Sequence, residues 1–144
     1  MYQSVAALLT QVGHTDLPVL ISSPVDYLSL EYYASGDLKH RLYEPLDTPA
    51  EIKYSNTDTV GRNLALLAPY MPPSIELHLP YYRDFLAQYP GFLLYANTGG
   101  EDRFDWWIRR FKHEGAEMKS LVKWGPEEIY LATPKAMPGA NPNE

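Results

Sequence analysis

The sequence predicts a single α/β domain with three layers, a Rossmann-like arrangement in which helices cover both faces of a mostly parallel sheet. Two short apolar runs, LPVLIS at 17–22 and GFLLYA at 91–96, have the continuous hydrophobic pattern of strands buried on both faces. Segments with helical periodicity alternate with these runs. A Gly-Pro turn at 125–126 separates two further strand-like segments, which indicates an antiparallel hairpin at the C-terminal edge.

The N-terminal part is predicted to form a helix, a strand and a second helix. Apolar residues recur at helical spacing over 2–12, and a glycine follows where a helix commonly ends. The run at 17–22 is the best candidate for a central strand. Ser23 then supplies an N-cap and Pro24 suits the first helical position, so a helix is expected over 24–34.

The middle of the chain is predicted to hold a second strand and further helices. The strand covers 40–46, where a proline restricts its end to a sheet edge or an exit. The sequence Thr-Pro-Ala-Glu at 48–51 has the cap, proline and acid pattern of a helix start, and a further helix is capped by Asp58 or Thr59. Residues 75–79 alternate over too few positions to distinguish a strand from an extended loop. Pro80 can start the next helix.

The C-terminal part carries the clearest helix pattern of the chain. Four apolar residues fall at i, i+3, i+4 and i+7, and a glycine closes the segment: Phe104, Trp107, Ile108 and Phe111. The two hairpin strands follow, over 118–124 and 129–133. The domain is therefore expected to cover 1–133. Residues 134–144, with three prolines, are predicted to be a flexible tail.

Composition excludes several classes of protein. With 12 basic and 18 acidic residues the formal charge is −6, which argues against a nucleic-acid partner, because phosphate neutralisation needs clustered Lys and Arg. The chain has no cysteine, which excludes disulfides, thiolate metal sites and a cysteine nucleophile. No run approaches the roughly 18 apolar residues of a membrane span, and the N-terminus lacks the pattern of a signal peptide, so a soluble domain is expected.

No motif in the sequence announces a catalytic, metal or cofactor site. The four histidines lack the H-x-x-x-H and H-E-x-x-H spacings of zinc sites. No G-x-S-x-G, G-x-G-x-x-G or P-loop pattern occurs. Acidic residues at 101–105 and 127–128 could form a glycosidase pair, but a helix start and a turn favour caps and solvated charges there. We therefore predict no catalytic residue, no metal and no cofactor.

The best candidate for a ligand site is the rim at the carboxyl ends of the two buried strands. Ligands of open α/β sheets bind beyond these ends, and the loops after the two strands should be neighbours. The plainer interpretation is that the first loop only caps the helix that follows it. The rim residues proposed for ligand binding are Ser22, Ser23, Asp26, Asn97 and Asp102.

Aromatic residues are unusually frequent, and 12 of them are tyrosine. Trp107 belongs to the apolar stripe of its helix, which leaves the adjacent Trp106 pointing elsewhere. Trp106 is therefore a candidate anchor for a protein partner, although aromatic residues at helical spacing more often belong to a core.

The order of the segments resembles the soluble region after the last membrane span in some bacterial family 39, ArnT-like glycosyltransferases. The resemblance covers residues 17–133, and it is carried by the following runs in this order: LPVLISSPVDYLSLEYYASGDLKHRLYEPLD, YSNTDTVGRNLALLAPYMP, YRDFLAQYPGFLLYA, a Trp-bearing helix, GAEMKSLVKW and IYLAT.

Enzymes of this family move a sugar from a polyprenyl-phosphate donor, and their catalytic acidic residues lie near the N-terminal membrane helices, a region with no counterpart here. The resemblance implies a non-catalytic accessory domain on the periplasmic side of the inner membrane, which positions the acceptor or gates the membrane-embedded active site. Its partners would be the membrane region of the parent enzyme, or the polyprenyl-linked sugar or acceptor glycan. Two alternatives stay open: a stand-alone small α/β enzyme or ligand-binding protein that uses the rim, and an adaptor anchored by Trp106.

Overall fold

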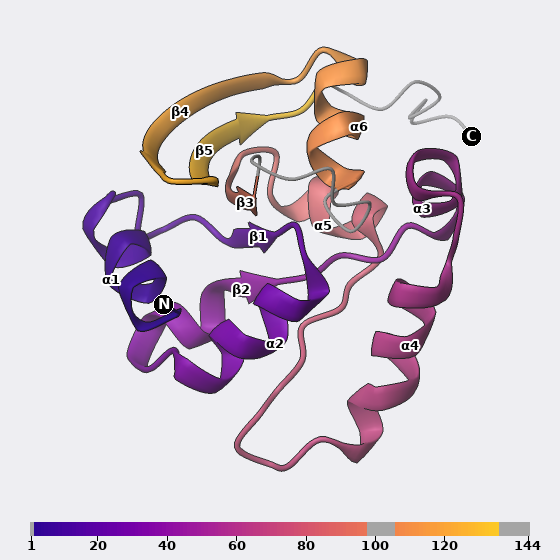
Figure 1. The fold of residues 1–144 in the computed structure, drawn as a ribbon, viewed down its shortest axis with the longest axis horizontal. Coiled ribbons are helices and arrows are strands. Elements are labelled where there is room, and N and C mark those ends of the chain that lie inside the picture. The colour runs from indigo at the N-terminus through magenta and orange to yellow at the C-terminus, as the bar shows by residue number, and fades with distance from the viewer. Residues whose placement is uncertain (1, 98–105, 136–144) are drawn as a thin grey trace.

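The structure, a computed structural model, describes residues 2–97 and 106–135 and has a five-stranded mixed sheet at its centre (Figure 1). The strand order is β2-β1-β3-β5-β4. Strands β2 and β3 both run parallel to β1, whereas β5 is antiparallel to β3 and to β4. The α/β class and the C-terminal hairpin are therefore confirmed. The strands are β1 (Val19–Ile21), β2 (Leu42–Tyr43), β3 (Phe92–Asn97), β4 (Glu117–Trp124) and β5 (Glu127–Thr133).

One face of the sheet is covered by the N-terminal elements α1 (Tyr2–Gln11), α2 (Pro24–Tyr33) and the short 3-10 helix η1 (Gly36–Arg41). Alternate residues of the central strands, such as Val19 and Ile21, point into this core and pack against the helices. Successive side chains of a strand point to opposite faces of the sheet, so every second residue of β1 and β3 is buried on this face.

The opposite face is covered by α5 (Tyr82–Gln88) and α6 (Trp106–Glu114). This second core contains Leu20 and Leu94 from the strands. Helix α3 (Thr48–Ser55) packs against α6 at its edge. Because both faces are covered, β1 and residues 92–96 of β3 are apolar at every position, as their sequences predicted.

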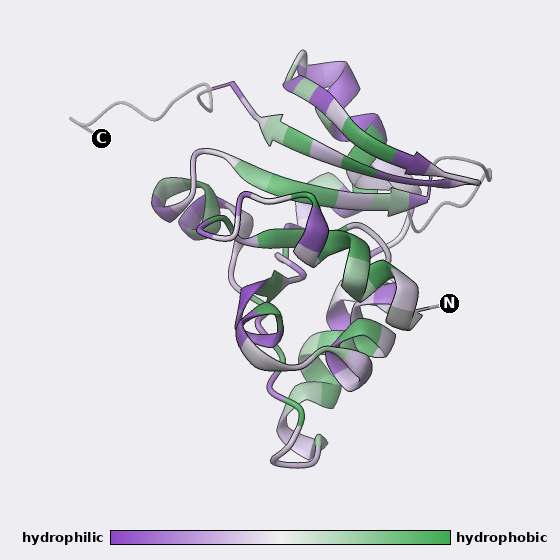
Figure 2. Ribbon diagram, turned by 90° about the vertical axis from the view of Figure 1, so that its left-hand side faces the viewer, coloured by the Kyte–Doolittle hydropathy of each residue, from purple (hydrophilic) through white to green (hydrophobic). Residues whose placement is uncertain are grey.

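A protruding arm interrupts this arrangement between α3 and α5. It consists of α4 (Thr59–Leu67) and the 3-10 helix η2 (Ala68–Tyr70), which extend away from the sheet (Figures 1 and 2). Figure 2 shows that the arm is largely hydrophobic, and Leu66 and Tyr70 are exposed on it. The chain returns through an extended segment that adds no strand to the sheet, and its last residue, Tyr81, forms an isolated parallel bridge with Leu46.

The predicted strand over 40–46 is largely wrong. A 3-10 helix continues to Arg41, and only Leu42–Tyr43 joins the sheet. The reason is the Arg41 side chain, which donates hydrogen bonds to the carbonyl oxygens of Leu17 at 2.7 Å and His14 at 2.9 Å and so holds this part of the chain against the loop before β1. Phe104 and residues 136–144 of the predicted tail lie outside the described residues.

Within the described ranges, the structure contains no helix with the length and apolar character needed to cross a bilayer.

Candidate functional site

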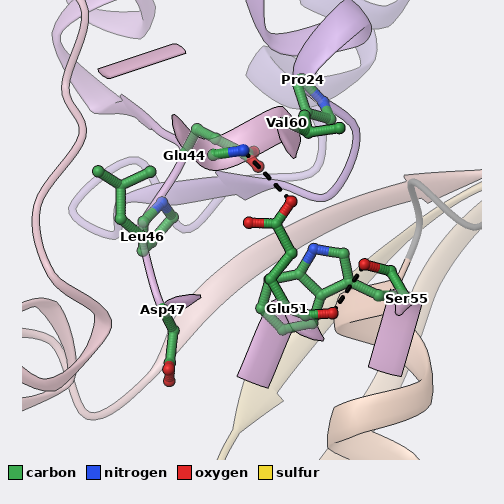
Figure 3. A pocket seen from close by; sticks show the side chains of 10 residues that line it. Pro24, Glu44, Leu46, Asp47, Glu51, Ser55 and Val60 are labelled. Carbon is green, nitrogen blue, oxygen red and sulfur yellow. Dashed lines mark hydrogen bonds between the residues drawn. The ribbon is translucent and has the colours of Figure 1, made fainter. Parts of the chain in front are cut away.

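A pocket lies at the carboxyl edge of the parallel strands (Figure 3). Its volume is about 330 Å³ including the open mouth, and little of that space is enclosed. It is therefore a shallow hollow with space for about one buried water or one polar group of a ligand. Its lining residues are Pro24, Glu44, Pro45, Leu46, Asp47, Glu51, Ser55, Val60, Gly61 and Trp106.

The sheet topology places the pocket. Pro24 begins the helix after β1, Glu44 follows β2, and Trp106 begins the described helix after β3. After β1 the chain crosses to β2 on one side of β1, whereas β3 lies on the other side of β1. The boundary between β1 and β3 is therefore a topological switch point, the place where α/β proteins commonly bind ligands. The pocket lies beside this switch point, toward β2.

Asp47 fixes one wall of the pocket through two interactions. Its Oδ1 accepts a hydrogen bond from the Ala50 backbone N–H at 3.2 Å, which caps α3. Its Oδ2 accepts one from Arg110 Nη1 at 2.6 Å. Figure 3 shows the Asp47 carboxylate turned away from that of Glu51. The prediction that Thr48 caps this helix is wrong by one residue: the cap is Asp47, which has a non-helical backbone, and Thr48 is the first helical residue.

Arg110 is almost fully buried and reaches Asp47 from α6. Its Nε also donates to Glu114 Oε1 at 3.0 Å, and its guanidinium lies 4.3 Å from the ring centre of Tyr82. Burial opposes the positive charge, but the hydrogen bond and the charge of Asp47, together with Glu114, outweigh it and raise the pKa of Arg110 above its ordinary value. The guanidinium therefore stays protonated at any pH at which the protein folds.

Glu51 caps a different helix from the one it belongs to. Its side chain lies on α3, and its Oε1 accepts a hydrogen bond from the Gly61 N–H in the first turn of α4 at 3.2 Å (Figure 3). Asp58, at the N-cap position of α4, makes no side-chain cap hydrogen bond, so Glu51 takes that role. Burial raises the pKa of Glu51, and the N–H groups of Gly61 and Val60 oppose this effect without cancelling it.

Gly61 leaves the space that the Glu51 carboxylate occupies. A Cβ at position 61 would lie 2.7 Å from Glu51 Oε2, closer than any normal contact. Ser55 completes this part of the pocket, because its Oγ donates to the Glu51 carbonyl oxygen at 2.7 Å (Figure 3). The close approach of α3 and α4 at Gly61 therefore sets the shape of the pocket floor.

Trp106 is buried, with 6% of its surface exposed, so the prediction that it points away from the core is wrong. It stacks on Trp107 with ring centres 4.1 Å apart, and Tyr54 from α3 stacks on it with rings 6.4 Å apart and 9° from parallel. The physical reason is α3, which covers the side of α6 that periodicity alone leaves to solvent. Trp106 contributes to one wall of the pocket and, within this chain, offers no exposed patch.

The described residues of the predicted rim do not line the pocket. Ser22 is fully buried, and its N–H donates to Tyr95 O at 3.0 Å, which confirms that the ends of β1 and β3 are neighbours. Ser23 is the N-cap residue of α2 but makes no side-chain cap hydrogen bond. Asp26 is half-buried in the first turn of α2.

Asn97, the last residue of β3, is half-buried and pairs with Glu127. Asp102 lies outside the described residues. None of these candidates lines the pocket, which opens one strand further toward β2.

Sequence reasoning missed the three acidic residues of the pocket, Glu44, Asp47 and Glu51, as site residues. The Asp-Thr-Pro order at 47–49 is a signal that could have identified Asp47 as a cap. Glu44 and Glu51 are each only 4% exposed. No local sequence pattern indicates this burial, because acidic residues are normally exposed. Among residues 2–97 and 106–135, no three His, Asp or Glu side chains are grouped to hold a metal ion.

Comparisons with protein-family models, with curated proteins and with solved structures gave no match to this chain.

Proposed function

We propose that this chain is a non-catalytic domain that positions a hydroxyl-rich ligand, such as an acceptor glycan, at the pocket on the carboxyl edge of the sheet. The observation that carries the proposal is the joint lining of this pocket by acidic side chains and an indole. Carboxylate oxygens accept hydrogen bonds from sugar hydroxyls. The faces of the Trp106 indole are covered by Trp107 and Tyr54, so the indole contributes only its edge to the pocket wall. The pocket lies next to the switch point, where this class of sheet binds ligands.

The existing bonds of the carboxylates support positioning over catalysis. Asp47 uses both oxygens, one for the cap of α3 and one for Arg110. Glu51 uses its carboxylate for the first turn of α4. A general acid or base must release and regain a proton at the substrate, which would break these bonds in each cycle. The shallow floor further implies that a ligand inserts one hydroxyl and leaves its remaining groups at the mouth.

We further propose that the domain acts beside a membrane glycosyltransferase, as the periplasmic accessory domain that the order of its segments implies. The partner in this proposal is the membrane region of that enzyme, and the ligand is its acceptor glycan or polyprenyl-linked sugar. The finer fold class, a Rossmann-like domain with three layers, belongs to the same proposal. It is supported by the two buried cores on opposite faces of the sheet.

An NMR titration of the purified chain with a panel of neutral and amino-sugar oligosaccharides tests the ligand. We expect at least one oligosaccharide to shift the backbone amides of Ser55 and Gly61 and the indole N–H of Trp106. Val60→Phe should abolish these shifts, because Val60 lines the pocket and a larger side chain fills its mouth. Asn63→Phe is the matched control, since it places the same side chain at an exposed position of the same helix outside the pocket.

Two results would contradict the proposal. If every oligosaccharide left the pocket amides unchanged, or if Val60→Phe bound as well as the wild type, the pocket would not be the site. Turnover of a sugar donor by the purified chain would show that the domain is an enzyme and would favour the stand-alone alternative.

A further inference from the structure

Glu31 is a fully buried carboxyl group outside the pocket. It lies on α2 and has no exposed surface, and among the described residues neither carboxylate oxygen has a hydrogen-bond partner of normal geometry, although the Tyr27 hydroxyl lies close to it. Burial raises its pKa to about 7, while the charge of Lys39 and the Tyr27 hydroxyl oppose the rise and the charge of Glu76 adds to it. Such a group changes its charge near neutral pH, and the interior must then accommodate a carboxylate.

Lys39 and Tyr27 also hold the extended segment 74–81, which we call the strap. Lys39 Nζ donates a hydrogen bond to the Ser74 carbonyl oxygen at the start of the strap. The His78 backbone N–H donates to the Tyr27 hydroxyl at 2.6 Å in its middle. The two side chains that favour ionisation of Glu31 are therefore the two that fasten the strap to η1 and α2.

The strap in turn forms part of the support of the pocket wall. The Glu44 N–H donates to His78 O at 3.1 Å, and the Leu46 N–H donates to Pro80 O at 2.7 Å. Both Glu44 and Leu46 line the pocket. A change in how the strap is held would therefore reach the pocket through main-chain hydrogen bonds.

We propose that Glu31 is a protonation-dependent lock on the strap. Neutral Glu31 leaves Lys39 bonded to Ser74, so the strap is docked. When Glu31 loses its proton to solvent, the carboxylate attracts the Lys39 ammonium group away from the Ser74 carbonyl, and the first part of the strap loosens. This inference goes beyond the proposed function, because the movement of the strap requires no ligand.

Other charged groups lie on the elements around Glu31 and must be distinguished from it in a pH experiment. Helix α1, which packs on α2, has no charged residue over 4–11. On α4, Arg62 and Asp58 pair with each other at 3.6 Å. On the strap itself, His78 Nε2 lies 3.9 Å from Glu76 Oε1, so variants of both residues serve as controls.

Hydrogen–deuterium exchange of strap peptides between about pH 5.5 and 8.5, corrected for the intrinsic pH dependence of exchange, tests the lock. We expect protection of the strap to fall roughly tenfold across this range in the wild type, as the lock opens. Glu31→Gln cannot ionise and should keep the strap protected at both ends of the range. Glu76→Gln, which removes an exposed carboxylate from the same cluster, should keep most of the wild-type pH dependence.

The proposal is overturned if Glu31→Gln loses protection with pH as the wild type does, or if His78→Asn abolishes the loss. A carbon-13 NMR titration of the wild type gives a test that needs no variant. The Glu31 carboxyl should titrate close to neutral pH, together with a shift of the Ser74 and His78 signals. A midpoint below about pH 5, near the ordinary value for glutamate, would equally overturn the lock.

Discussion

Arg110 Nη1 lies 2.6 Å from Asp47 Oδ2, and this ion pair joins α6 to the residue that caps α3. The side chain of Arg110 is 6% exposed and that of Asp47 is 20% exposed, so the pair is largely removed from solvent. Asp47 lines the pocket, and α6 belongs to the second core. The pair therefore fixes the pocket wall to the body of the domain.

Asp47→Ala should destabilise the fold by about 3 kcal/mol, because it removes a helix cap and leaves a buried guanidinium with one carboxylate fewer. Urea denaturation followed by circular dichroism measures this change. Asp58→Ala is the matched control: Asp58 occupies the equivalent position of α4 but makes no side-chain cap bond and pairs only with the exposed Arg62. We expect a cost below about 1 kcal/mol there. Equal losses in the two variants would contradict the role given to the buried pair.

The effect of Gly61→Ala on stability should depend on the residue at position 51: destabilising with glutamate there and stabilising with alanine. In the wild type, the added methyl group meets Glu51 Oε2 at 2.7 Å and displaces the carboxylate from the first turn of α4, which costs about 1–2 kcal/mol. In the Glu51→Ala background the clash is absent, and alanine should stabilise the helix by up to about 1 kcal/mol relative to glycine. A double-mutant cycle from denaturation midpoints measures the coupling, and additive effects would contradict the Glu51 cap.

Glu31 should make the stability of the fold decrease as pH rises from acid to neutral. Burial raises the pKa of its carboxyl group from 4.5 to about 7 in the folded chain. Below the unfolded value both states carry the proton, and above it the unfolded chain releases its proton first, so stability falls until the folded group also ionises. The loss between about pH 4 and 8 should be of order 3 kcal/mol.

Urea denaturation of Glu31→Gln and wild type at several pH values checks this direction. The difference in unfolding free energy should move in favour of the glutamine variant as pH rises. A constant difference across the range would show that Glu31 ionises in both states at the same pH.

Trp106→Ala should lower stability by about 3 kcal/mol, because the indole is buried between Trp107 and Tyr54 and its removal leaves a cavity. Trp124 is the matched control on the hairpin, with 43% of its surface exposed, and Trp124→Ala should cost less than about 1 kcal/mol. Thermal unfolding of the two variants makes the comparison. Similar costs would mean that Trp106 is not packed as described.

The α/β class could be predicted from the sequence because its strongest signals are local. The runs at 17–22 and 91–96 are apolar except at Ser22, and burial on both faces of β1 and β3 is the physical cause. The strand at 40–46 could not be predicted correctly, since the side chain of Arg41 bonds to carbonyl groups more than twenty residues away. The pattern at 75–79 does not distinguish a strand from an extended loop for a similar reason: the His78 carbonyl accepts its hydrogen bond from Glu44, just after β2, and not from a sheet neighbour.

The candidate site could be predicted only in its general place. The topology put the ends of β1 and β3 side by side, as the bond from Ser22 to Tyr95 confirms. The pocket itself depends on Glu51 reaching α4 and on Arg110 reaching Asp47, contacts across 10 and 63 residues that no spacing rule contains. Burial of Trp106 likewise depends on Tyr54 from another helix.

The size and cell fraction of the native polypeptide test the central proposal most directly. An antibody raised against the purified domain would detect that polypeptide in fractions of its source cells. The accessory-domain proposal predicts a membrane-bound product several times larger than the 16.4 kDa of this chain. A product near 16.4 kDa in the soluble fraction would contradict it and would make this domain a protein that acts alone.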